Sequence, residues 1–73
     1  MPEQFTIIFE PAEEGGYIAT IPEVPGAFSQ GESIEEAREM VIDAMRELIA
    51  YRLDKALATK SEGSTVEKIP LTV

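Results

Sequence analysis

Carboxylates are the main candidates in this sequence for catalysis or metal binding. The 73 residues include 14 acidic residues but no histidine and no cysteine. Neither a Ser-His nor a Cys-His nucleophile can therefore be built. Ser29 and Ser33 have no obvious base, and Ser33 is better explained as a helix cap. These residue types disfavour nucleophilic catalysis.

Two adjacent pairs of carboxylates are the candidates for holding Mg²⁺ or Ca²⁺. Glu13 and Glu14 lie in a glycine-rich loop, and Glu35 and Glu36 lie at a helix start. Adjacent residues of a helix do not face each other, and these hard cations need several oxygen ligands together. We interpret both pairs as solvated surface, and we expect no metal and no cofactor.

The net charge of −8 bears on the kind of partner. Proteins that bind nucleic acids usually carry a basic face, whereas six basic residues are outnumbered here by 14 acidic ones. Direct binding to nucleic acid is disfavoured. The charge suits a basic partner, and the alternative interpretation is that it only keeps a small protein soluble.

The sequence shows neither a membrane span nor a targeting segment. No stretch approaches the ~20 apolar residues that cross a bilayer. The first residues, Met1 to Gln4, contain no basic region. We therefore expect a soluble, cytoplasmic protein.

Short apolar segments between prolines and glycines predict three strands. They are Phe5–Phe9, Tyr17–Ile21 and Ala27–Gln30, the first two forming a hairpin. Because successive side chains of a strand point to opposite faces of the sheet, Ile8 lies on the other face from Phe9, and Ile18 on the other face from Ala19.

A long helix should follow the third strand. Ser33 and Glu36 form an S-x-x-E capping box, and the pattern continues to about Leu57. Such a helix is ~36 Å long, so its last turns are free to reach a partner subunit. An apolar stripe that would pack on the sheet consists of Ile34, Ala37, Val41, Ala44 and Leu48.

A last segment, Val66–Val73, is predicted as a fourth strand, and Pro70 places it at an edge or a bulge. The fold class is therefore α+β, in the order β-β-β-α-β, with one sheet on one helix. We expect residues 1–73 to form a single domain. The small core that such a chain can build favours a homo-oligomer.

The ordered motifs resemble those of a known family. The stretch GGYIATIPEVPGAFSQGESIEEAREMVIDAMRELIAYRL is similar to the HicB-like antitoxins of bacterial type II toxin–antitoxin systems, and the similarity covers about Phe5 to Leu53. The segment VEKIPLTV resembles the closing strand of that family. Ala27 stands where the family often has cysteine. The residues that carry the pattern are Gly16, Tyr17, Pro22, Pro25, Gly26, Ser29, Gln30, Gly31, Ser33, Glu36 and Ala37.

The resemblance implies a partial ribonuclease H-like fold and a function without chemistry of its own. Members of the family bind and block HicA, a small basic toxin that cleaves messenger RNA. Many members append a DNA-binding domain, for which there is no room after Leu57, so promoter binding is not expected. The residues predicted to contact the partner are Tyr17, Pro25, Phe28, Ser29, Gln30, Glu32, Glu35 and Glu36.

Two other functions remain open, and so does the role of one segment. In place of an antitoxin, the chain is a solitary homo-oligomeric binding or regulatory module without a toxin, or it is a residual ribonuclease H-like nuclease. The predicted strands Phe5–Phe9 and Tyr17–Ile21 contain no carboxylate, which disfavours the nuclease. The segment Pro22–Gly31 also has two possible roles. Either it presents Val24, Ala27 and Phe28 to a partner beside the helix start, or it is only a tight turn with Phe28 in the core.

Overall fold

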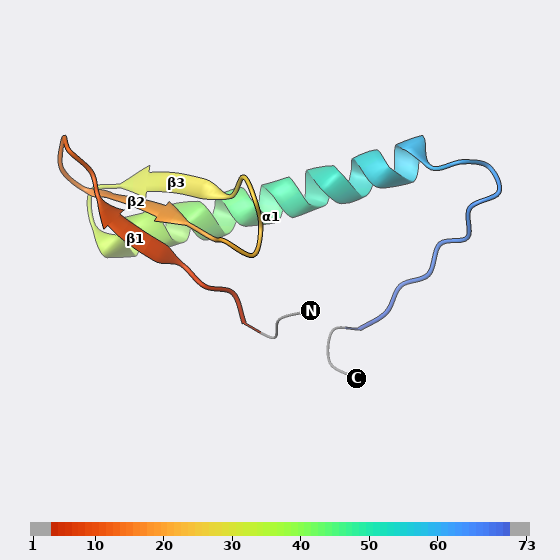
Figure 1. Ribbon diagram of the computed structural model, residues 1–73, viewed down its shortest axis with the longest axis horizontal. Coiled ribbons are helices and arrows are strands. Elements are labelled where there is room, and N and C mark those ends of the chain that lie inside the picture. The colour runs from red at the N-terminus through yellow and green to blue at the C-terminus, as the bar shows by residue number, and fades with distance from the viewer. Residues whose placement is uncertain (1–3, 71–73) are drawn as a thin grey trace.

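The computed structural model describes residues 4–70 and contains one antiparallel sheet and one long helix (Figure 1). The elements are β1 (Ile8–Pro11), β2 (Tyr17–Thr20), β3 (Phe28–Gly31) and α1 (Ile34–Thr59). The α+β class and the order β-β-β-α are confirmed. The helix lies across one face of the sheet, with most of its contacts to β3.

Strand β1 lies at one edge of the sheet, in the order β1-β2-β3. It begins three residues later than predicted, at Ile8, and includes Pro11, which pairs with Tyr17. A proline is tolerated there because an edge strand needs only one ladder of hydrogen bonds. Residues 4–7 pair with no strand in the described part of the chain, and the Thr6 amide donates instead to the Glu23 carboxylate at 2.9 Å.

The predicted fourth strand is wrong where the structure describes it. Residues 60–70 form no strand and are all exposed, while residues 71–73 lie outside the described part of the chain. The physical reason is the length of α1, whose far end lies well beyond the sheet (Figure 1). The segment that follows α1 therefore starts far from any strand with which it could pair.

The capping box at the start of α1 is confirmed. The Ser33 hydroxyl accepts a hydrogen bond from the Glu36 amide at 3.1 Å. The Glu36 carboxylate in turn accepts one from the Glu32 amide at 2.9 Å. Just before this cap the backbone of β3 touches the helix, because a Cβ atom at Gly31 would lie 2.5 Å from the Ala37 nitrogen. Only glycine fits at this position.

A small core fills the space between the sheet and the helix. Its buried members are Ala19, Ile21, Val24, Ala27, Ala37 and Val41. The burial of Val24 and Ala27 shows that the prediction of both as presented surface was wrong. Ile34 was expected to begin the helix stripe but is exposed at the first turn, since Ala37 is the first helix residue that faces the core.

The loop between β2 and β3 lies against the middle of α1, not against its start. The Arg52 guanidinium donates a hydrogen bond to the Pro25 carbonyl. Gly26, at φ +92°, lets the chain turn where a Cβ atom would meet the Leu48 side chain. The contact of Arg52 with Pro25 marks the end of the part of α1 that the sheet and its loops cover.

Candidate partner-binding surface

The sheet face turned away from α1, called here the outer face, is covered by no helix or strand of residues 4–70. It consists of two cross-strand rows, Ile8–Thr20–Phe28 and Glu10–Ile18–Gln30. Directly paired residues of antiparallel strands point to the same side of the sheet. The alternate positions, Phe9 and Ala19 among them, face the helix and the core.

Apolar side chains occupy three of the six positions of the outer face. Ile8 is 46 % exposed, Ile18 is 38 % exposed and Phe28 is 66 % exposed. A solvated sheet face usually carries polar residues, and a contiguous exposed apolar patch typically marks an interaction site. The exposure of Phe28 also contradicts the interpretation that placed this side chain in the core.

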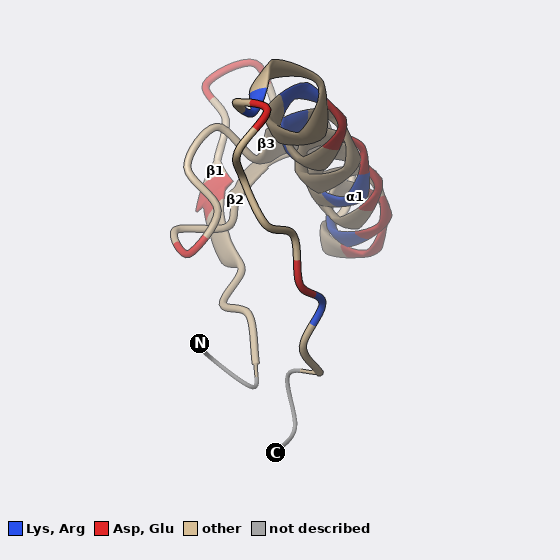
Figure 2. Ribbon diagram, turned by 90° about the vertical axis from the view of Figure 1, so that its right-hand side faces the viewer, with Lys and Arg blue, Asp and Glu red and all other residues tan. Residues whose placement is uncertain are grey.

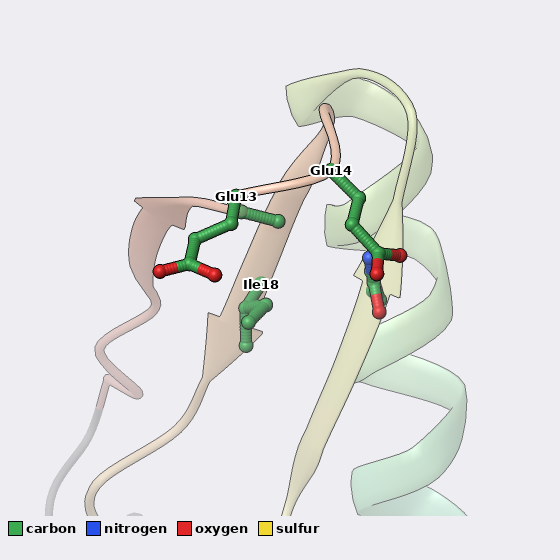
Figure 3. Close-up of a pocket in the computed structure, with 5 residues that line it drawn as sticks. Glu13, Glu14 and Ile18 are labelled. Carbon is green, nitrogen blue, oxygen red and sulfur yellow. The ribbon is translucent and has the colours of Figure 1, made fainter.

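A shallow hollow of about 350 Å³ lies at one end of the outer face. The β1–β2 loop folds back over it, because Gly15 and Gly16 adopt φ values of 102° and 78°. Glu13 and Glu14 hang from this loop on either side of Ile18 (Figure 3). An apolar floor between two carboxylates fits a long side chain with a cationic end, such as lysine or arginine.

A second hollow, of about 380 Å³, adjoins the first and shares Glu14 and Gln30 with it. Glu32 and Glu36 from the helix start line its other side. Carboxylates of the β1–β2 loop and of the first turn of α1 therefore form an acidic rim along one end of the outer face.

The structure brings together only some of the residues predicted from the sequence. Phe28 and Gln30 lie on the outer face, and Glu32 and Glu36 border it. Glu35 is exposed on the first helix turn but lines neither hollow.

Three other predicted residues lie elsewhere. Tyr17 and Ser29 are half-buried on the helix side of the sheet. Pro25 is held by Arg52, which lies about 25 Å along the helix axis from Glu35. The structure therefore separates these three residues from the outer face, and their contact with a partner stays a prediction.

Sequence reasoning did not select Ile8, Ile18 or Glu10 for this surface. The alternation placed both isoleucines on the face opposite to Phe9 and Ala19, but it did not show which of the two faces the helix covers. An apolar residue on the face that the helix leaves open is exposed unless another chain covers it. Glu10 could not be assigned, because the predicted first strand ended at Phe9.

Negative charge surrounds this end of the molecule. Residues 1–44 contain ten acidic residues and a single basic one, Arg38. Acidic positions occur in β1, in the loops of the sheet and along the side of α1 turned away from the sheet (Figure 2). Arg38 lies 5.7 Å from the centre of the Phe9 ring, on the core side. The outer face therefore lies in a field that attracts cations.

One carboxylate near this surface has a perturbed pKa. The Thr6 hydroxyl donates to Glu23 at 2.6 Å, and the Thr6 amide donates to the same group. These bonds favour the ionised form and lower the pKa of Glu23 below its usual value of 4.5. They tie the segment before β1 to the β2–β3 loop.

Two other kinds of feature are absent from residues 4–70. No group of three or more histidine, cysteine, aspartate or glutamate side chains is arranged in this part of the chain to hold a metal ion. Over the same residues, no helix combines the length and the apolar character that crossing a bilayer requires.

Comparison with known proteins places these features in a family. The profile of the HicB-like antitoxins of bacterial toxin–antitoxin systems matches residues 5–71. An antitoxin HicB of Photorhabdus laumondii is 45 % identical over 42 residues, which are 58 % of this chain and 27 % of that protein. A UPF0150 protein of Synechocystis is 43 % identical over 54 residues, 74 % of this chain and 75 % of the relative. A second UPF0150 protein of Synechocystis is 31 % identical over 68 residues, which are 92 % of this chain and 93 % of that relative.

Proposed function

This chain belongs to the HicB-like antitoxins of bacterial toxin–antitoxin systems, and we propose that it binds a HicA-type, RNA-cleaving toxin and inhibits it by protein–protein contact. The antitoxin inhibits by covering the toxin and catalyses no reaction itself. The toxin contacts the outer face of the sheet and the acidic rim at one end of that face.

The observation that carries the proposal is the composition of the outer face. Ile8, Ile18 and Phe28 supply an exposed apolar centre, and carboxylates border it at the β1–β2 loop and the helix start. Protein interfaces typically combine an apolar core with a polar rim. A rim of one sign selects a partner of the opposite sign and accelerates encounter, which matches the basic toxin that the family resemblance implies.

A second candidate function rests on the coverage of the relatives. The match spans 27 % of the Photorhabdus antitoxin but 75 % and 93 % of the two UPF0150 proteins. Their name states no partner. This favours, as the alternative, a solitary binding or regulatory module without a toxin. The ribonuclease H-like relation and the cytoplasmic location stay predictions from the sequence.

The test is co-expression of the tagged chain with the small basic protein encoded beside it, followed by RNA cleavage with and without the chain. A stable complex that abolishes cleavage supports the antitoxin function. A toxin that cleaves RNA equally well in the presence of excess chain contradicts it and favours the solitary module.

A further inference from the structure

The second half of α1 continues beyond the part of the molecule that packs on it. Leu48 is the last half-buried residue of the helix, and every residue from Ile49 to Thr59 is exposed. This segment extends for about 16 Å, and Figure 1 shows it projecting past the sheet. Most of the stability of a helix in a protein comes from tertiary packing, but within residues 4–70 this segment has only the Arg52 contact with the β2–β3 loop.

The projecting segment carries a row of apolar side chains at intervals of four residues. The row, called here the helix ridge, consists of Met45, Ile49, Leu53 and Leu57. Residues four apart on a helix form the ridges that pack into the grooves of another helix. Met45 begins the ridge at the edge of the core, and Leu53, near its middle, is 52 % exposed.

The surface area of the chain exceeds what a compact monomer exposes. A folded monomer of 8.0 kDa exposes roughly 4,500 Å², whereas this chain exposes 6105 Å². Its radius of gyration is 15.5 Å, against roughly 11 Å for a compact domain of this length. The excess, roughly 1,600 Å², includes the extended residues 60–70.

The charge distribution decides which end can meet a second copy. A two-fold contact joins the same patch of both copies, so a strongly acidic patch repels itself. Residues 1–44 hold ten acidic residues and one basic residue, but residues 45–73 hold four acidic and five basic ones. The helix ridge lies in the nearly neutral part.

We propose that a second copy of this chain packs against the helix ridge, helix on helix, around a two-fold axis. The contact buries the projecting turns of both copies and keeps their acidic ends apart. It also leaves the outer face of each sheet free, since that face lies opposite to α1. This inference goes beyond toxin binding and does not depend on it.

The test is the mass of the full chain in solution, measured by light scattering after size exclusion over a wide range of concentrations. Leu53→Glu puts a carboxylate into the centre of the ridge. Tyr51→Glu puts the same charge on the same helix at a position that is 60 % exposed and about 160° around the axis from Leu53, and serves as the matched control. Helix content from circular dichroism, recorded for each variant, separates loss of association from loss of folding.

We expect the chain and Tyr51→Glu to run at twice the 8.0 kDa of the monomer, and Leu53→Glu to dissociate at about hundredfold higher concentration. We also expect the melting temperature of the unmodified chain to rise with its concentration. A chain that is monomeric at every concentration overturns the proposal. So does a dimer that survives Leu53→Glu, because the contact must then lie elsewhere.

Discussion

Replacing Phe28 by threonine separates the two roles that an apolar side chain can have in this sheet. Phe28 ends the row Ile8–Thr20–Phe28 of the outer face and is 66 % exposed. Threonine keeps the preference for a strand but removes the aromatic surface. The proposed contact surface therefore loses its largest apolar group while the core between the sheet and α1 stays unchanged.

The expected magnitudes follow from the exposed fraction. A phenylalanine side chain presents about 200 Å², so about 130 Å² of Phe28 remains for a partner to cover. At about 25 cal/mol per Å², covering it contributes about 3 kcal/mol to binding, or roughly 200-fold in Kd. The third already buried contributes only about 1–2 kcal/mol to folding.

The assay is calorimetric titration of a catalytically silenced HicA-type toxin with each variant, together with thermal unfolding of the variant alone. Tyr51→Ala is the matched control, since this side chain is 60 % exposed but lies on α1, away from the outer face. We expect Phe28→Thr to weaken binding much more than the control. Equal affinities for Phe28→Thr and the unmodified chain, with both folded, would refute the assignment of the contact to the outer face.

Three further predictions concern the glycine at the helix contact and two sets of carboxylates. Gly31→Ala should lower the free energy of unfolding by about 1–3 kcal/mol, because its Cβ would meet helix backbone 2.5 Å away. Gly63→Ala, with nothing within 4 Å of the added atom, should change it little in the same denaturation experiment. The pKa of Glu23 is lowered by hydrogen bonds that favour its ionised form. Glu23→Gln should therefore be less stable than the unmodified chain above pH 4.5, and the two stability curves should meet as the pH falls through the lowered pKa. Joint replacement of Glu13 and Glu14 by glutamine should slow toxin association about tenfold at low salt and leave it nearly unchanged at high salt. Stopped-flow rates that show no dependence on salt in either form would contradict this steering.

The elements themselves were largely predictable because their signals are local. A capping box and a long apolar period defined α1, and the prediction of its end at about Leu57 differs by two residues from Thr59. The three strands were found, with bounds that differ from the predicted ones by at most three residues. The displacement of β1 arises because its bounds depend on where β2 offers hydrogen-bonding partners, which no local pattern records.

The candidate surface was only partly predictable, since it depends on which face of the sheet the helix covers. Alternation assigned Ile18 and Ala19 to opposite faces, but either face is a possible core until the helix position is known. Pro25 and the acidic helix start are near in sequence, yet β3 carries the chain the length of the sheet between them. Neighbours in sequence were therefore not neighbours on the surface.

By itself, the sequence determined the class of fold, the start of α1, the absence of histidine and cysteine and the strong negative charge. These follow from composition and from hydrogen bonds between residues at most four positions apart. Only the tertiary structure decided that Val24 and Ala27 are buried, that Phe28 is open to solvent and that the helix extends past its core. Those outcomes depend on how the sheet and the helix pack together, because burial is a property of the whole arrangement and not of a residue type.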